Sequence, residues 1–181
     1  MTVALSTGTW NLDMSHTEIG FTVRHAGISK VRGQFADAEA TLVIGDTLAS
    51  SAVEASVKTA SFDSNDDNRD AHVKGEDFFD VEKYPEMTFK ATSAEGDFED
   101  FKLTGDLTIK DTTLPVTFDA ECGGVAVDPF GATRVGFSAK TQISRKEFGL
   151  TWNAALEAGG VLVGDKVTIE IDAAFVLPEA N

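Results

Sequence analysis

The sequence predicts an all-β fold, an antiparallel β-barrel of about eight strands with one short inserted helix. Apolar and polar residues alternate along most of the chain, which is the pattern of strands with one dry and one wet face. Many apolar faces contain alanine or glycine, and small inward residues leave room inside a closed sheet. A chain of 181 residues, 42% hydrophobic, can bury a substantial core. We assign residues 1–181 to one domain.

The first strand is predicted in "TEIGFTVRH", residues 17–25, where Ile19, Phe21 and Val23 share one face. His25 falls on this apolar face by parity. His16 precedes the strand and follows Asp13, which we expect to accept backbone hydrogen bonds in a tight turn. Nine residues of strand separate the two imidazoles by roughly 30 Å, so they cannot share one metal ion. We therefore expect no metal site here.

Further strands follow from the same alternation. It is clear in residues 101–109, 114–120, 135–143 and 167–175, and weaker in 36–44, 53–57 and 87–91. "KDTT", residues 110–113, has the composition of a hairpin turn. The pattern leaves barrel and sandwich open, because the alanines could instead accommodate large side chains from a facing sheet.

Residues 64–80 break the alternation. Their first part is rich in Ser, Asn and Asp, which begin helices, and Gly75 would end one. We predict a helix near residues 65–74, capped by Ser64 or Asn65.

The charge excludes several classes of partner. Thirty acidic residues against fifteen basic ones give a net charge of −15, which repels nucleic-acid phosphates and anionic lipid head groups. We expect no nucleic-acid binding and no membrane docking through a basic patch. No apolar run approaches the ~20 residues of a membrane span, so no stable membrane insertion is expected. The N-terminal residues lack the pattern of a secretory leader, which predicts a cytoplasmic protein.

Stretches along nearly the whole chain, from Trp10 to Phe175, resemble the YceI-like family of lipocalin-like, polyisoprenoid-binding proteins. In order they are "TWNLDMSHTEIGFTVRH", "SFDSNDDNRDAHVKGEDFFDVEKYPEMTF", "LTGDLTIKDTTLPVTF", "ISRKEFGLTWN" and "LVGDKVTIEIDAAF". The resemblance implies an extended barrel whose elongated apolar cavity holds a long isoprenoid chain, such as a polyprenyl phosphate or a quinone-type lipid. It also implies binding or carriage without catalysis.

In such a barrel the inward residues would line or fill the cavity. The candidate ligand-binding residues are Ile19, Phe21, Val23, His25, Phe89, Leu107, Ile109, Leu114, Val116, Phe118, Phe137, Val167, Ile169 and Ile171. His25 could meet a head group at the barrel mouth. The cations suited to an anionic head group are Arg24, Arg69, Arg134 and Arg145, although each is more often an ordinary surface ion pair.

Two other functions stay open. A small barrel enzyme could act on an apolar substrate, or a packed β domain could act through protein partners, including a second copy as a homodimer. The chain contains no GxSxG, HExxH or CxxC motif, so we expect no enzyme, no catalytic residue and no cofactor beyond a bound lipid. The lone Cys122 is read as a small buried hydrophobic residue.

Overall fold

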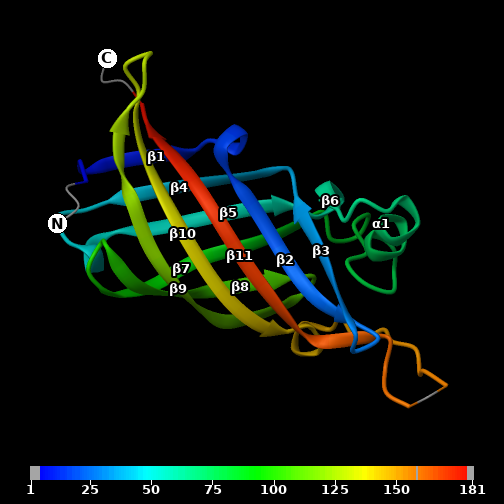
Figure 1. The fold of residues 1–181 in the computed structure, drawn as a ribbon. Coiled ribbons are helices and arrows are strands. Elements are labelled where there is room, and N and C mark those ends of the chain that lie inside the picture. Colours follow the sequence, from blue (N-terminus) through cyan, green and yellow to red (C-terminus); the bar gives the residue numbers. More distant parts are fainter. Residues whose placement is uncertain (1–4, 158, 179–181) are drawn as a thin grey trace.

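The protein is a closed antiparallel barrel with one short helix outside it (Figure 1). The computed structural model describes residues 5–157 and 159–178. The strands are β1 (Gly8–Leu12), β2 (Glu18–His25), β3 (Ser29–Phe35), β4 (Ala38–Ile44), β5 (Ala52–Lys58), β6 (Phe62–Asp63), β7 (Glu86–Gly96), β8 (Asp100–Ile109), β9 (Thr112–Val127), β10 (Thr133–Ser144) and β11 (Val163–Leu177). Short 3-10 helices are η1 (Met14–His16), η2 (Leu48–Ser50), η3 (Thr59–Ser61) and η4 (Arg145–Phe148).

The eleven strand segments form eight barrel strands, because three of these barrel strands are bent and each is divided into two segments. β1 and β2 are the two halves of one strand, as β3 and β4 are of the next: β2 pairs with β3, and β1 pairs with β4. β5 and β6 likewise continue each other beside β4 and β3. The predicted barrel is confirmed, and the sandwich is excluded.

β11 closes the barrel by pairing with both halves of the first strand. Between these pairings, residues 13–17 lie opposite residues 173–174, so the first strand bulges outward at η1. Three hydrogen bonds bridge the bulge: Asp13 N–H donates to Ala174 O (2.8 Å), Ala174 N–H to Thr17 Oγ1 (3.1 Å), and the Thr17 hydroxyl to Asp13 O (2.7 Å). These bonds link the bulge to β11 where the regular ladder is interrupted.

The Asp13 carboxylate holds the bulge to a neighbouring strand. It accepts hydrogen bonds from Ser15 N–H (3.0 Å) and from Nη1 of Arg134 on β10 (2.5 Å), and His16 Nδ1 lies 3.0 Å away. Arg134 also donates to Asp128 at 2.7 Å. The predicted turn at Asp13 is confirmed. His16 supports that turn and faces solvent.

The predicted helix is α1 (Asp67–Lys74), and Gly75 ends it as expected. The predicted cap is wrong: Asp66 caps the helix by accepting from Arg69 N–H. Asn65 has a left-handed φ of 67°, and the Ser64 hydroxyl is used by neighbouring side chains instead. In the described part of the chain, no helix has the length and apolar character needed to span a membrane.

The strand predictions from alternation are largely confirmed by the pairing registers. Lys110 and Asp111 make the two-residue β8–β9 turn, with Lys110 at a φ of 58°. One departure is Ala36, predicted on an apolar face but exposed, because the strand breaks between β3 and β4. Its N–H donates to Ser61 O instead of to a ladder partner.

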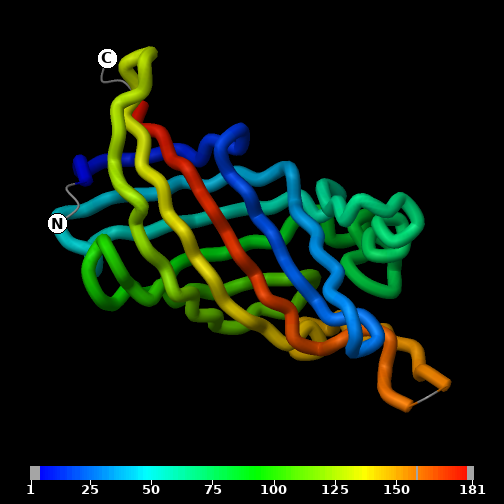
Figure 2. The backbone as a smooth tube through the Cα atoms, viewed as in Figure 1, coloured from blue at the N-terminus to red at the C-terminus, as the bar shows by residue number. Residues whose placement is uncertain are grey.

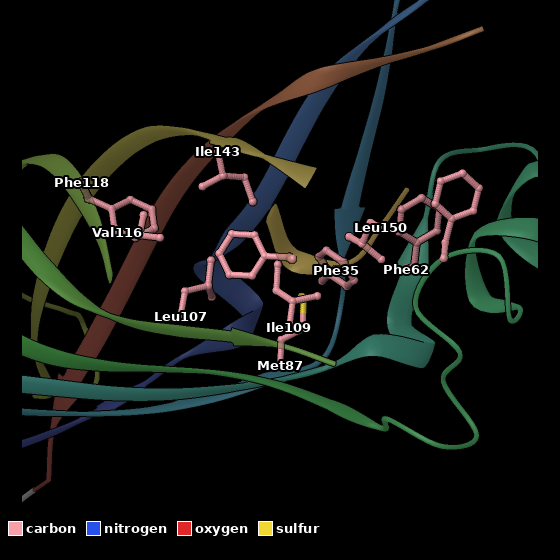
Figure 3. Packing of buried hydrophobic residues seen from close by; sticks show 11 residues of the cluster. Phe35, Phe62, Met87, Leu107, Ile109, Val116, Phe118, Ile143 and Leu150 are labelled. Atoms are coloured by element: carbon pink, nitrogen blue, oxygen red, sulfur yellow. The ribbon is translucent and has the colours of Figure 1, made fainter. Parts of the chain in front are cut away.

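Buried side chains form two clusters inside the barrel. The first lies toward α1; its buried members are Phe35, Phe62, Phe78, Met87, Leu107, Ile109, Val116, Phe118, Ile143, Phe148 and Leu150 (Figure 3). The second lies toward the chain termini and contains Trp10, Leu42, Ile44, Val135 and Phe175. The space between and beside the clusters is where a ligand could lie.

Replacing Asp13 with Asn should destabilise the seam, the place where the η1 bulge of the first strand meets β10 and β11, in a pH-dependent way. Hydrogen bonds from Ser15, Arg134 and His16 hold the pKa of the Asp13 carboxyl well below its ordinary value of 3.8. Its stabilisation is therefore complete above the unfolded-state pKa and is lost as the pH falls toward the folded-state pKa. We expect Asp13→Asn to lower the free energy of unfolding by about 1–3 kcal/mol at neutral pH, and by progressively less below pH 3.8.

Urea denaturation at a series of pH values measures this difference. Asp119→Asn is the matched control, because Asp119 is exposed and pairs only at the surface with Lys102; it should cost under about 1 kcal/mol. A pH-independent loss for Asp13→Asn would show that geometry, not charge, stabilises the seam.

Candidate binding cavity

An internal cavity of about 660 Å³ runs along the barrel. This volume lies within the range of sites for organic ligands, about 300–1,000 Å³. The lining extends from Phe78 and Trp152 beside α1 to Leu48 and Phe98 toward the other end. The cavity is therefore elongated and touches both hydrophobic clusters.

Most of the sequence-predicted binding residues line this cavity. They are Ile19, Phe21, Val23, His25, Phe89, Leu107, Ile109, Phe118, Phe137, Val167, Ile169 and Ile171. Leu114 and Val116 lie elsewhere: Val116 is buried in the first cluster and Leu114 packs against it. Their strand face is as predicted, but they fill the barrel beside η4 instead of lining its open part. Ligand contact by any of these residues stays a prediction.

Inward side chains are not fully buried along β2 and β11. Ile19, Phe21, Val167, Ile169 and Ile171 pack against the first cluster yet are only partly buried. All of them line the cavity, so the surface they leave exposed is turned toward its interior. Figure 3 shows Leu107, Ile143 and Phe118 of the cluster reaching into the same interior from different strands.

Two phenylalanine rings are kept close to the barrel wall by glycines. Phe21 pairs with Gly33 across β2 and β3, and a Cβ at Gly33 would lie 2.3 Å from Phe21 Cζ. Phe89 covers Gly105 of β8 in the same way, with a Cβ 2.4 Å from its Cζ. Because each ring occupies the space of a missing side chain, it lies against the sheet. It therefore leaves the bore, the hollow interior of the barrel, open.

The charged and imidazole side chains of the lining are gathered at one end. They are Arg24, His25, Asp66, Arg69, His72 and Arg145, from β2, α1 with its cap, and η4. The opposite end is lined by apolar or small side chains such as Leu48, Ala52 and Phe98. Such a cavity suits an amphiphile with its polar group near α1 and its hydrocarbon in the bore.

The side chains at the α1 end are held by local contacts. The His72 ring packs edge-on against Trp152 with centroids 4.5 Å apart, and His72 Nε2 lies 2.8 Å from Asp77 Oδ2. Arg69 donates from Nε to Ser64 Oγ and from Nη2 to Ser64 O, both at 2.8 Å. Since Ser64 directly follows β6, Arg69 fixes the helix to the barrel.

Of the four candidate cations, Arg145 departs most from the expected surface ion pair. It is not a surface ion pair: it is 3% exposed, and its guanidinium donates to the carbonyl oxygens of Gly164 (2.8 Å), Leu150 (2.6 Å), Trp152 (2.9 Å) and Val163 (3.1 Å). Burial lowers the pKa of Arg145, and the nearby Asp165 charge opposes that shift. Arg145 thus organises the segment between η4 and β11 that covers this end of the cavity.

Among residues 5–157 and 159–178, no group of three or more His, Cys, Asp or Glu side chains is placed to hold a metal ion. Cys122 packs half-buried against the second cluster, and burial raises the pKa of its thiol, so it resists ionisation.

Comparison with known proteins identifies the family. The model of the YceI-like domain matches residues 10–175. The chain belongs to the YceI-like family. A UPF0312 protein of Staphylococcus epidermidis is 36% identical over 169 residues, covering 92% of this chain and 96% of the relative. This confirms the resemblance seen in the sequence.

Solved structures agree with this fold. The YceI protein of Campylobacter jejuni is 33% identical, has a TM-score of 0.72, and is matched over 93% of this chain and 97% of its own. A polyisoprenoid-binding domain from Saccharophagus degradans is 11% identical with a TM-score of 0.70, over 96% of this chain and 100% of its own. That likeness concerns the fold alone. The same barrel fold is thus found at 33% and at 11% sequence identity.

Arg145→Met should loosen the cover of the cavity. The variant leaves buried carbonyl oxygens without donors, so we expect a loss of about 3 kcal/mol or more in unfolding free energy. Hydrogen exchange should rise specifically in residues 150–164, as measured by mass spectrometry. Lys146→Met is the matched control, because Lys146 is its exposed neighbour in η4. Equal effects of the two substitutions would contradict a special role for Arg145.

Gly33→Ala should narrow the cavity. Phe21 already stacks on Phe62, with centroids 5.1 Å apart, so a new methyl group can only push its ring toward the bore. We expect a destabilisation of about 1–3 kcal/mol and weaker binding of an apolar naphthylamine dye, followed by fluorescence titration. Gly136→Ala is the control, since nothing lies within 4 Å of a Cβ there. Unchanged dye binding in Gly33→Ala would show that Phe21 does not border the ligand.

Proposed function

We propose that this YceI-like protein binds a long-chain isoprenoid lipid inside its barrel, for carriage, storage or sequestration. A polyprenyl phosphate or a quinone-type lipid is the expected ligand class. The observation that carries the proposal is the elongated, largely apolar cavity whose charged groups all lie at one end. The polar group of the lipid would lie near α1 and the tail would extend toward Phe98.

The physical basis is burial of hydrocarbon. Each buried methylene stabilises by about 0.8 kcal/mol, so one five-carbon isoprene unit contributes up to roughly 3–4 kcal/mol. Ordering a flexible chain offsets part of this gain. A few buried units therefore suffice for tight binding without a specific polar contact. The residues at the Phe98 end would then select chain length by limiting how far the tail can enter.

Family membership supports the same ligand class. The Saccharophagus degradans domain with this fold is named for polyisoprenoid binding, and this chain matches the YceI-like domain from Trp10 to Phe175. We also propose that the protein acts without catalysis. His16 serves the seam turn, and His72 lies against Trp152 and Asp77, so each is engaged in a structural contact.

Native mass spectrometry of protein purified from its own host tests the proposal. We expect an adduct whose mass corresponds to a prenyl lipid, and uptake of added ubiquinone or undecaprenyl phosphate by protein stripped of it. A protein that carries no lipid under gentle conditions and takes up neither compound would contradict the proposal.

Ile169→Asp should abolish lipid retention, because an unpaired carboxylate in an apolar bore is costly. Phe137→Asp should do the same from β10. Gln142→Asp, on the exposed outer face of β10, is the matched control and should retain lipid. Circular dichroism identifies variants that fail to fold, and Ala139→Phe, which fills the bore with an apolar ring, provides a second test. Retention by folded Ile169→Asp would show that the lipid does not lie in this cavity.

A further inference from the structure

The β2–β3 hairpin differs in charge from the rest of this acidic protein. Between residues 19 and 35 the chain has Arg24, Lys30 and Arg32 but no Asp or Glu, although the whole chain carries a net charge of −15. In the part of the chain that the structure describes, none of these three cations forms an ion pair. The hairpin is therefore a locally cationic element.

The cations lie together on the outer face of the barrel. Val23 and Val31 pair and line the cavity, so strand alternation places the side chains of Arg24 and its direct partner Lys30 on the other face. Arg24 is exposed and also borders the end of the cavity. Like charges directly opposite each other in a sheet are destabilising. Lys166 is exposed in the irregular stretch of β11 opposite Arg24 and adds a fourth cation. Arg24 and Lys30 lie opposite each other with no carboxylate in an ion pair, and this arrangement suits an anionic surface outside the protein.

An exposed apolar tip accompanies this charge. Ile28, at the turn of the hairpin, is 87% exposed, and Val161 in the neighbouring loop is 49% exposed. The two segments are joined by a hydrogen bond from Ala26 N–H to Leu162 O, 2.7 Å long. Figure 2 shows the blue turn beside the orange loop, at the end of the barrel away from both termini. Apolar residues flanked by Lys and Arg are typical of segments that rest in a bilayer interface.

This tip adjoins the polar end of the cavity. Arg24 and His25 of the hairpin and Leu162 and Val163 of the loop belong to its lining. A ligand that leaves or enters at this end would therefore pass the exposed Ile28 tip. This juxtaposition links the cationic surface to the route of the ligand.

We propose that the β2–β3 hairpin, with the adjoining loop at Val161, is a docking surface for an anionic lipid bilayer. The cations would face the head groups and Ile28 would enter the interface, with the cavity end turned toward the membrane. The proposal extends the proposed function by giving the lipid a path between bilayer and barrel. It concerns peripheral contact and not insertion.

The net charge does not oppose such contact. At 0.1 M salt the Debye length is about 10 Å, whereas β11, with 15 residues at about 3.3 Å each, spans roughly 50 Å. Carboxylates at the far end of the barrel are therefore screened from a membrane at this end. Of the acids at this end of the barrel, Asp165 is held by Ser144 and by the Lys146 backbone, while Asp66, Glu147 and Glu157 are exposed. Docking at this local surface would depart from the repulsion by anionic lipid that net charge alone predicts.

Vesicle flotation tests the proposal with the full chain. We expect binding to vesicles of equimolar phosphatidylcholine and phosphatidylglycerol, and much weaker binding to phosphatidylcholine alone. Each basic residue near an anionic surface raises partitioning about fivefold, so Lys30→Glu combined with Arg32→Glu, two exposed positions outside the cavity lining, should lower it by about 25-fold or more. Lys90→Glu combined with Lys102→Glu changes the net charge equally at exposed positions elsewhere, and should lower it less than about twofold.

A second pair of variants tests the apolar tip. Ile28→Ser should lower partitioning by about tenfold. Phe130→Ser is the control, because Phe130 is 90% exposed at the β9–β10 turn, which lies at the other end of the barrel (Figure 1). Both positions are exposed turns, so these substitutions should leave the fold intact, which circular dichroism verifies.

Three results would overturn the proposal: equal binding to the two vesicle types, equal losses for the hairpin and control variants, or a preference for a duplex DNA oligonucleotide over the anionic vesicles. None of these depends on lipid inside the barrel. Protein that retains a prenyl lipid in native mass spectra but ignores vesicles would refute docking and leave the proposed function standing. Protein that binds vesicles but never retains a lipid would support docking and refute the proposed function.

Discussion

Pairing of β11 with both halves of the bent first strand is the constraint on which the structure depends. It closes the sheet on itself, so the inward side chains are enclosed. The bulge at η1 allows one strand to follow two directions. Asp13 and Thr17 form hydrogen bonds with backbone groups there. Without this closure there would be a curved sheet and no bore.

The hollow interior follows from what the strands carry on their inner faces. Large side chains gather in two clusters, while glycines opposite Phe21 and Phe89 let those rings lie along the wall. Arg145 then holds the segment that covers one end through backbone carbonyls alone. Charged groups meet the cavity only at that end within the described lining. A bore with one polar and one apolar end is the physical basis for accepting an amphiphile in a single orientation.

Alternation sufficed to predict the strands, their inward faces and part of the cavity lining, because it depends on each strand alone. It could not place Leu114 and Val116 beside η4 instead of the open bore, since that depends on how the closed end is filled. The helix was predictable but its cap was not, because Ser64, Asn65 and Asp66 are all competent caps and tertiary contacts decide among them. The partners of Arg145 are carbonyls of an irregular loop, which leave no signature in the sequence. The net charge of the whole chain gave no sign of the cationic hairpin, because acidic residues elsewhere outweigh its three cations.

The most direct test of the central claim is an electron-density map of the barrel interior, from crystals of protein purified from its own host. A closed, hollow barrel that holds an isoprenoid lipid predicts continuous elongated density from the α1 end toward Phe98, with Phe21 and Phe89 lying against their glycines. Side chains collapsed across the bore with no such density, or a barrel open between β11 and the first strand, would contradict it.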